Sequence, residues 1–313
     1  MYHEVWQQIL SSNKIVILSH INPDSDAIGS SLALYNALKG FKNVTVVNFT
    51  KELPLNVDFL DGFDKIKHEM PKSYDLVISV DCGNYNRLGF EVTSKIINLD
   101  HHEVHEDYGT YNIIDGNLAS SSLVVYKLLK ANSIKISKSV ATCIYTALVA
   151  DCGFFKYESV NAEVFEISAE LLKAGVNANF VANMLTQRVS LAKFRLTQFV
   201  LETMELYIAG KVAIIYATLE MFRKSGAKRV DCEGISSIPR TLATVELSIF
   251  LIEELNGDIK VSFRSKTNLD VSKIADEFGG GGHIHSSGAV FKSSSVESVK
   301  SILINYLKKV IHE

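Results

Sequence analysis

The stretch Lys14-Ile-Val-Ile-Leu-Ser-His20 is almost continuously apolar, is rich in β-branched residues, and ends in a polar residue. Three later runs are also β-branched and nearly continuously apolar, at residues 43–49, 75–81 and 95–100. Such runs are typical of strands that are buried on both faces of a parallel sheet. Segments rich in helix formers lie between and after these runs, at residues 27–39, 121–131 and 138–150. This alternation predicts an α/β domain in which helices flank a mostly parallel sheet.

The chain is long enough for two domains. It has 313 residues, of which 47% are hydrophobic, and domains typically contain about 100–200 residues. From about residue 161 the sequence turns helical, and a strand-like run begins a new pattern at residue 212. We therefore expect a first domain at residues 1–185, a helical linker at 186–208 and a second, smaller domain at 209–313.

The second domain is expected to be an α/β unit with a mixed sheet. Asn256-Gly257 is a strong signal for a tight turn between two antiparallel strands. The expected strands are at residues 244–251, 259–263 and 289–291, and the expected helices are at 271–278 and 296–311.

Composition excludes several classes of protein. The 32 Lys and Arg residues nearly balance the 35 Asp and Glu residues, which disfavours a protein that coats long nucleic acid by bulk electrostatics. The 4 cysteines form no Cys-x-x-Cys pair, so neither a disulfide framework nor a zinc knuckle is indicated. We find no secretory signal and no apolar run near the ~20 residues that span a bilayer. We therefore expect a cytoplasmic protein with no membrane partner.

Acidic and histidine side chains gather at the expected ends of the strands. In an open α/β sheet, ligands bind outside the carboxyl ends of the strands. One carboxylate there would be ordinary, since Asp is common in loops and helix caps. Here the residues at or near such ends are His20, Asp24, Asp26, Asp81, Asp100, His101, His102 and Asp151. So many on one edge predict a shared site.

Carboxylates that converge in one site need positive charge. Two like charges ~4 Å apart repel by roughly 4 kcal/mol at an effective dielectric near 20, so bare carboxylates would take up protons or destabilise the fold. A mixed set of Asp oxygens and His nitrogens suits Mn²⁺ better than Mg²⁺ or Zn²⁺. We expect two Mn²⁺ ions, because the set can supply a bridging carboxylate with ligands on each side. Such pairs activate water for attack on phosphorus.

Three other segments have less specific patterns. His102-Glu103-Val104-His105 places its second histidine one position too early for the zinc-protease motif. Residues 279–282 follow a helix, which disfavours a Rossmann loop and leaves a flexible turn or a backbone nest for phosphate. Residues 120–122, a run of serines, are best interpreted as the N-cap of the next helix, although their N–H groups could also contact a phosphate.

Taken in order, the motifs resemble those of the DHH/DHHA1 phosphoesterases. The matching residues are His20-x-x-x-Asp24-x-Asp26, Asp81, Asp100-His101-His102, Asp151-Cys-Gly and Gly280-Gly281-Gly282-His283. The resemblance covers nearly the whole chain and implies a catalytic DHH domain followed by a substrate-binding DHHA1 domain. The family includes RecJ exonucleases, nano-RNase/pAp phosphatases and cyclic-dinucleotide phosphodiesterases.

The resemblance also implies a role for each residue of the first domain. One metal ion would be bound by His20 and Asp24, the other by Asp26, His101 and Asp151, with Asp81 bridging both. His102 would face the scissile phosphate and either stabilise its developing charge or protonate the leaving oxygen. Asp100 would support the ligands from outside the metal sites. His102 and Asp100 are therefore the expected catalytic pair.

In the second domain the resemblance implies a site for the substrate. Gly280, Gly281, Gly282 and His283 match the glycine-rich motif of the family and would bind a phosphate. Arg264, at the end of an expected strand, would be the matching side chain, because a guanidinium fork pairs well with a terminal phosphate. An arginine in that position is otherwise usually solvated.

The family branch that fits best is the nano-RNase/pAp phosphatases. It implies a Mn²⁺-dependent enzyme that degrades short RNA or DNA oligonucleotides to mononucleotides and converts 3′-phosphoadenosine 5′-phosphate (pAp) to AMP. An alternative is a phosphodiesterase of signalling dinucleotides, acting on cyclic di-AMP or linear pApA with the same metal centre. An inorganic pyrophosphatase would match only the first domain. A non-catalytic binding protein should have lost ligands that are all present here.

A few residues near the motifs have two interpretations. Phe154, Phe155 and Tyr157 could stack on a base, although such a cluster is more often part of the core. Arg87, six residues after Asp81, could bind substrate or lie on the surface. A homodimer is the oligomer to expect first, because dimers are the commonest assembly of soluble homo-oligomers.

Overall fold

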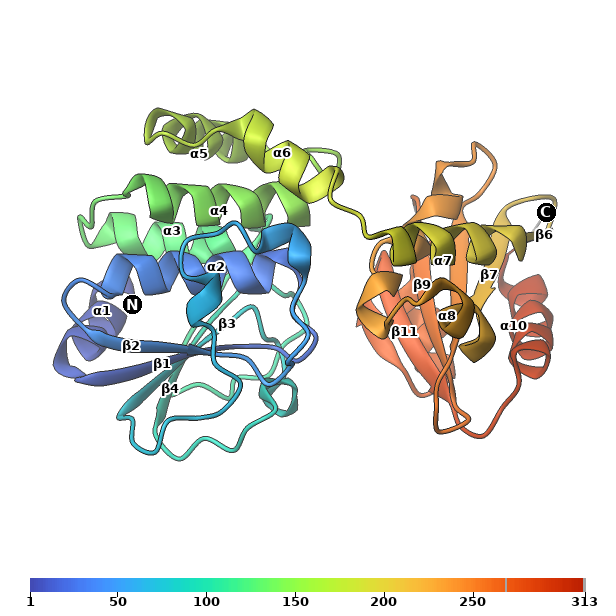
Figure 1. Ribbon diagram of the computed structural model, residues 1–313, viewed down its shortest axis with the longest axis horizontal. Coiled ribbons are helices and arrows are strands. Elements are labelled where there is room, and N and C mark those ends of the chain that lie inside the picture. The colour runs from blue at the N-terminus through green and yellow to red at the C-terminus, as the bar shows by residue number, and fades with distance from the viewer. Residues whose placement is uncertain (268, 312–313) are drawn as a thin grey trace. The chain divides into compact units, whose positions relative to one another are not determined.

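The chain folds into two units, Met1–Arg188 and Val189–Glu313. The computed structural model describes residues 1–267 and 269–311 (Figure 1). Each unit has its own sheet and its own hydrophobic core. Within the described ranges, no helix combines the length and the apolar character that a membrane crossing requires.

The first unit contains a five-stranded sheet in the order β2-β1-β3-β4-β5. Its strands are β1 (Lys14–Ser19), β2 (Asn43–Val47), β3 (Leu76–Val80), β4 (Lys95–Asp100) and β5 (Tyr111–Ile114). Every neighbouring pair in this sheet is parallel. The expected parallel sheet is therefore confirmed, and its strand ends lie at a common edge.

The two faces of this sheet bury alternate residues of each strand. In β1, Ile15 and Ile17 belong to the core beneath the helices, whereas Val16 and Leu18 belong to a second cluster under loop segments. Both faces are thus apolar, as the unbroken hydrophobic runs predicted. Figure 1 shows α2, α3 and α4 on one face of the sheet. The helices are α1 (Tyr2–Ser11), α2 (Ser25–Leu38), α3 (Ser121–Ala131), α4 (Lys138–Asp151), α5 (Ala162–Lys173) and α6 (Ala178–Thr186).

Helices α2 and α4 approach each other closely at Gly29. A Cβ atom at this position would lie 2.8 Å from Ala147 Cβ and 2.8 Å from the Cys143 carbonyl oxygen. Both distances are shorter than van der Waals contact, so a larger residue would force the helices apart. Glycine at residue 29 therefore sets the separation of α2 and α4.

The second unit contains a six-stranded mixed sheet in the order β10-β11-β9-β8-β7-β6. Its strands are β6 (Glu205–Tyr207), β7 (Val212–Ala217), β8 (Leu247–Glu253), β9 (Ile259–Ser265), β10 (Gly281–His283) and β11 (Ser286–Phe291). Its helices are α7 (Leu191–Glu202), α8 (Leu219–Ser225), α9 (Val271–Glu277) and α10 (Val296–Val310). Only β7 and β8 pair in parallel. The expected mixed sheet is confirmed.

The turn at Asn256-Gly257 joins β8 and β9, which pair antiparallel as expected. Gly257 has a φ of +82°, in the left-handed region that glycine adopts without strain. Strand β8 begins at Leu247, three residues later than expected, because residues 242–246 form bends and a turn.

Helix α7 lies inside the segment 186–208, which the sequence suggested as a linker. Its Leu196 and Val200 are fully buried in a cluster with Ile215 and Phe250 of the second sheet. The chain therefore divides just before α7, between Arg188 and Val189. The apolar face of α7 packs on the second unit.

The prediction missed several elements, including α1, β5, β6, α8 and β10. Helix α1 buries Val5, Trp6 and Ile9 against the first core. Strand β5 has four residues at the edge of its sheet, too few for a clear pattern. Strand β10 lies in the glycine-rich segment, where we expected a turn or a nest. The backbone of Gly281–His283 instead pairs antiparallel with β11.

Candidate metal centre

The predicted ligands come together at the carboxyl edge of the first sheet. His20 directly follows β1, Asp81 directly follows β3, and Asp100 is the last residue of β4. These strands are neighbours in the order β1-β3-β4, so their ends converge. Two helices add carboxylates at the same edge, Asp26 near the start of α2 and Asp151 at the end of α4. We call the eight predicted residues of this unit the acidic edge.

Asp24 fixes the start of α2. Its carboxylate accepts hydrogen bonds from the backbone N–H groups of Asp26 and Ala27, both at 3.0 Å, as an N-cap does. Ser25 is thereby the first helical residue. The cap also places the side chains of Asp24 and Asp26 at the end of the helix that faces the sheet edge.

The carboxylate of Asp26 is buried and held by four donors. Ser30 Oγ and Ser120 Oγ donate to Oδ1 at 2.7 and 2.9 Å. The backbone N–H of Ser121 donates to Oδ2 at 2.7 Å, and that of Ser122 donates to Oδ1 at 3.2 Å. The first N–H groups of α3 thus bind a carboxylate of the protein itself.

The three serines are therefore a structural part of the acidic edge. The prediction that Ser120 caps α3 is confirmed, since its hydroxyl accepts from the N–H of Ser122 at 3.0 Å. The sequence did not reveal that Asp26 takes the other N–H groups. Ser121 Oγ also donates to Asp81 at 2.9 Å, and it lies 3.3 Å from Asp100 Oδ1.

Three overlapping groups of side chains could each hold a metal ion. Within each group the potential ligand atoms lie within 4.8 Å of one another. The groups are His20 with Asp24 and Asp81, Asp26 with His101 and Asp151, and Asp81 with His101 and His102. The groups overlap at Asp81 and at His101.

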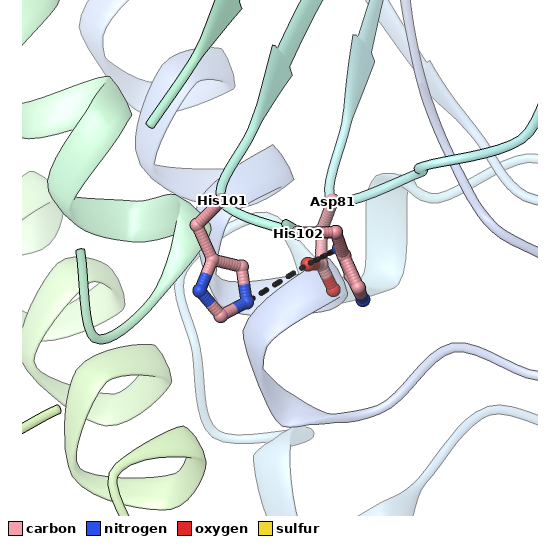
Figure 2. Close-up of side chains that lie close together, drawn as sticks. All are labelled: Asp81, His101 and His102. Atoms are coloured by element: carbon pink, nitrogen blue, oxygen red, sulfur yellow. Dashed lines mark ion pairs between the residues drawn. The ribbon is translucent and has the colours of Figure 1, made fainter. Parts of the chain in front are cut away.

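Asp81 lies at the centre of the acidic edge. Its Oδ2 lies 3.5 Å from His20 Nε2, and its Oδ1 lies 3.8 Å from His101 Nε2 and 3.7 Å from His102 Nδ1. Figure 2 shows the side chains of Asp81, His101 and His102 pointing toward one another. The two oxygens of one carboxylate therefore face two different sets of ligands.

The backbone of Asp81 is in the left-handed region, with a φ of +57°. Few residues other than glycine adopt this conformation, and Asp and Asn tolerate it best. Strain of this kind is concentrated at functional sites.

Hydrogen bonds orient two of the imidazole rings. His101 Nδ1 donates to the carbonyl oxygen of Leu118 at 3.0 Å, and because a carbonyl oxygen can only accept, the hydrogen of this ring is on Nδ1. His20 Nδ1 lies 2.9 Å from the carbonyl oxygen of Ile21 and 3.0 Å from Arg87 Nη2, and these two contacts orient its ring. In His101 the lone pair of Nε2 then faces the carboxylates. His101 Nε2 lies 3.3 Å from Asp151 Oδ2 and 3.9 Å from Asp26 Oδ2.

Asp100 binds the third ring. Its Oδ1 lies 2.7 Å from His102 Nδ1 and accepts from the N–H of His101 at 2.8 Å. The Asp100 side chain is fully buried. No donor among the described residues reaches its Oδ2. This contact leaves the Nε2 side of the His102 ring directed away from Asp100.

Burial and crowding shift the pKa values of the carboxyl groups. Burial, followed by the charge of Asp81, raises the pKa of Asp26 to about 7. Burial, followed by the charges of Asp26 and Asp24, raises the pKa of Asp151 well above its usual value. These groups hold protons that a nearby cation would displace.

The pKa values of Asp81 and of the three histidines shift in the direction that favours ion pairs. Burial would raise the pKa of Asp81, but the hydrogen bond and charge of His20 lower it below its ordinary value. Burial would lower the pKa of His20, His101 and His102, yet the adjacent carboxylates raise all three above the usual value. The site therefore carries more acidic than basic groups and stabilises positive charge.

The residues present fit a divalent metal ion. Asp oxygens and His nitrogens are donors for such ions. Asp26 and Asp151 retain protons where a cation would compensate their charge. The Nε2 atoms of His20 and His101 both lie near the carboxylate of Asp81. These observations qualify the acidic edge as a candidate metal centre.

The predicted substrate-binding residues belong to the second unit. Arg264 lies on β9, where Nη1 donates to the carbonyl oxygens of Phe263 at 2.9 Å and Ser287 at 3.5 Å. Gly280 precedes β10, and Gly281 and Gly282 are part of it. The side chain of His283 lies outside the described residues, although its backbone is part of β10.

Of the aromatic residues that follow Asp151, Phe155 packs inside the first unit. Its ring stacks on Phe165 with centroids 5.2 Å apart, and it contacts the first core. Gly153, Phe154 and Phe155 all have a φ near +60°. A Cβ atom at Gly153 would lie 2.5 Å from the ring of Tyr157, so only glycine fits there.

Comparison with known proteins assigns each unit to a known domain family. The model of the DHH family N-terminal domain matches residues 14–148, and the model of the DHHA1 domain matches residues 211–309. The bifunctional oligoribonuclease and PAP phosphatase NrnA of Thermus thermophilus is 30% identical over 289 residues, which cover 90% of this chain and 86% of the relative. The chain belongs to the DHH phosphoesterase family.

Two further similar proteins support this assignment. The bifunctional oligoribonuclease and PAP phosphatase NrnA of Bacillus subtilis is 26% identical over 298 residues, covering 92% of this chain and 93% of that protein. The crystal structure of an exopolyphosphatase-related protein from Bacteroides fragilis superimposes with a TM-score of 0.89 at 30% identity, covering 99% and 96% of the two chains. The DHH family consists of metal-dependent phosphoesterases, which agrees with the acidic edge as a metal centre.

Proposed function

We propose that the acidic edge binds two Mn²⁺ ions. His20 and Asp24 would hold one ion, Asp26, His101 and Asp151 would hold the other, and Asp81 would bridge them. The overlap of the ligand groups at Asp81 and the proximity of its two oxygens to two different histidines, His20 and His101, support this assignment. When bound, such ions polarise phosphoryl oxygens and activate water as a nucleophile.

In this proposal His102 and Asp100 are the catalytic pair. The contact at 2.7 Å between Asp100 Oδ1 and His102 Nδ1 fixes the orientation of the ring. The adjacent carboxylate raises the pKa of His102, so the ring holds a proton more readily than an ordinary histidine. A protonated ring at this position can stabilise charge on a phosphate or protonate a leaving oxygen.

We further propose that Arg264, Gly280, Gly281, Gly282 and His283 bind a phosphate of the substrate. Strand β10 is an edge strand, so its outer backbone can contact a ligand. The catalytic domain would then comprise about residues 1–185 and the substrate-binding domain about residues 209–313.

The proposed activity is degradation of short oligonucleotides to mononucleotides and conversion of pAp to AMP. The observation that carries it is the 30% identity, over both domains, to a relative named bifunctional oligoribonuclease and PAP phosphatase. Short RNA or DNA fragments as partners also agree with the cytoplasmic location that the sequence predicts. A homodimer stays a prediction.

A substrate panel tests this proposal. Purified protein with Mn²⁺ should release mononucleotides from dinucleotides and from oligonucleotides of three to five residues, and phosphate from pAp. Linear pApA, pGpG and cyclic di-AMP belong in the same assay, since a strong preference for the cyclic compound would favour the signalling alternative. No turnover of any dinucleotide or of pAp across Mn²⁺, Mg²⁺ and Co²⁺ would contradict the proposal.

A further inference from the structure

The loop after β2 lies beside the acidic edge and carries an exposed aromatic residue. Phe49, two residues past the end of the strand, is 53% exposed. The preceding residue, Asn48, is buried, and its side-chain amide donates to the backbone carbonyl of His20 at 3.0 Å. Phe49 is thus attached to the loop that holds a proposed metal ligand.

The ring of Phe49 is supported from one side. It meets the ring of Phe90 edge-on, with centroids 5.4 Å apart and an angle of 71° between the planes. Phe90 packs on the cluster beneath the sheet. Gly89 has a φ of +75°, and a Cβ atom there would lie 2.8 Å from Phe49. This close approach makes Phe49 a supported and exposed aromatic platform.

The same loop cluster places a guanidinium next to the proposed metal centre. Arg87 Nη2 lies 3.0 Å from His20 Nδ1, and the Arg87 carbonyl accepts from the N–H of Ile21 at 2.7 Å. The Ile21 carbonyl, 2.9 Å from the same ring nitrogen, competes with Arg87 for His20 Nδ1, since one is an acceptor and the other a donor. Among the described residues no carboxylate forms an ion pair with Arg87.

Gly89 connects these two features. Its nearest neighbours are Phe49 on one side and, at 2.9 Å from an ideal Cβ, the side chain of Ile21. Phe49 and the loop of Arg87 are therefore neighbours in one loop cluster beside His20. A nucleotide site combines a cation that pairs with the phosphate and an aromatic ring that stacks on the base.

We propose that Arg87 and Phe49 form a nucleotide subsite of the first unit. Arg87 binds an oxygen of the phosphate that is cleaved, and Phe49 stacks on the base attached to it. This inference rests on the proposed function, and it adds recognition of the base, which the metal centre alone does not provide. The subsite favours substrates that carry a base over abasic phosphodiesters.

A comparison of base-bearing and abasic dinucleotides tests the role of Phe49. The wild-type protein should have a kcat/KM about tenfold or more higher for the base-bearing compound, as expected for one stacked base. Phe49→Leu should bring this ratio close to one. An unchanged ratio in Phe49→Leu would overturn the proposal.

The chain offers a matched control at the other end of β2. Phe41 is 50% exposed and also contacts one aromatic residue, Trp6, at 6.4 Å between centroids. It lies before the strand, at the opposite edge of the sheet from His20. Phe41→Leu should keep the wild-type ratio, and a loss of the ratio in both variants would overturn the stacking role.

A binding measurement separates this inference from the proposed function. The chain has a single tryptophan, Trp6, which is buried. In Phe49→Trp, AMP with Mn²⁺ should quench the added fluorescence, whereas ribose 5-phosphate should not. If the wild type cleaves no dinucleotide, the proposed function fails, yet the quenching still decides the inference. Absence of quenching by AMP would contradict it.

Variants of Arg87 test the phosphate contact. Arg87→Gln should raise KM for a dinucleotide about tenfold and change kcat less, and Arg87→Lys should recover part of the loss. If Arg87 only balances the charge of the carboxylates, the substitution will change the Mn²⁺ concentration for half-maximal activity and leave KM unaltered. That result would overturn its place in the subsite.

Discussion

The acidic edge of the first unit and the glycine strand of the second, Gly280 with β10, are built in opposite ways. Asp26, Asp81 and Asp100 are at most 2% exposed, and hydrogen bonds from distant segments fix their side chains. The glycine strand has hardly any side chains, and its shape follows from backbone conformation and from contact with β11. Substitutions in the acidic edge should therefore reduce activity by removing charge. Substitutions in the glycine strand should do so by altering packing.

The largest effect is expected at Asp81. Asp81→Asn removes the central charge while keeping a residue that tolerates a φ of +57°. Removal of a single donor to a transition state costs about 10²–10³ in rate, and the loss of a ligand shared by two sites should exceed that. Steady-state hydrolysis of a dinucleotide measures the effect, with circular dichroism as the check on folding. Activity within tenfold of the wild type would show that Asp81 is not the bridge.

The next effect concerns the stability of the metal-free protein. Folded Asp26 holds its proton up to a pKa of about 7, against 3.8 ordinarily. Between these values the unfolded state binds fewer protons, so the stability that Asp26 contributes is complete below pH 4 and is lost as the pH rises to 7. Each pKa unit corresponds to about 1.4 kcal/mol, which makes the change a few kcal/mol.

Urea unfolding after chelation measures this change. Between pH 5 and 7.5 the free energy of unfolding should fall less in Asp26→Asn than in the wild type, because Asn has no proton to release. Saturating Mn²⁺ should stabilise the wild type more than Asp26→Asn. Equal pH dependence of the two metal-free proteins would contradict the burial of an uncompensated carboxyl at this position.

A smaller effect is expected at Arg264 in the second unit. Arg264→Met should raise KM for a dinucleotide about 10- to 100-fold, since hydrogen bonds to charged groups contribute about 1.5–3 kcal/mol. The value of kcat should change little, because the metal centre is intact. Arg264→Lys is the matched control that keeps the charge. A fall in kcat with KM unchanged would assign Arg264 a role outside binding.

The smallest effect is a difference in stability between variants of two adjacent glycines. A Cβ atom at Gly280 would lie 2.1 Å from the carbonyl oxygen of Gly288, whereas one at Gly281 would meet nothing within 4 Å. Gly280→Ala should destabilise the second unit by about 1–3 kcal/mol, the usual range for overpacking, and Gly281→Ala should not. Thermal unfolding of both variants measures this, and equal melting temperatures would contradict the close approach.

Much of the fold could be predicted from the sequence, because hydrophobic runs of strand length report burial directly. The runs around Ile15–Leu18 and Leu76–Val80 gave strands within one or two residues of those in the structure. Short elements were missed, since the four residues of β5 and the glycines of β10 carry no periodic pattern. The packing of α7 depends on a sheet that is distant in the sequence.

The composition of the acidic edge could also be predicted, since parallel strands end at one edge. The support of the carboxylates could not. The run of serines indicated a helix cap, but only the tertiary fold shows that its N–H groups bind Asp26. Nor does the sequence reveal that Phe49 stays exposed beside His20, because an aromatic residue after a strand is usually core.

The contact at Gly29 shows that a residue with no functional side chain can control the geometry of the proposed metal site. Asp26 lies on α2, and Asp151 lies on α4. Because Gly29 has only a hydrogen atom in place of a side chain, the two helices can approach each other as closely as they do. Any bulkier residue would widen the gap between Asp26 and Asp151, the two carboxylates proposed to hold the same ion. A mutation of Gly29, three residues from Asp26 and inside the hydrophobic interior, would thus weaken metal binding while looking purely structural.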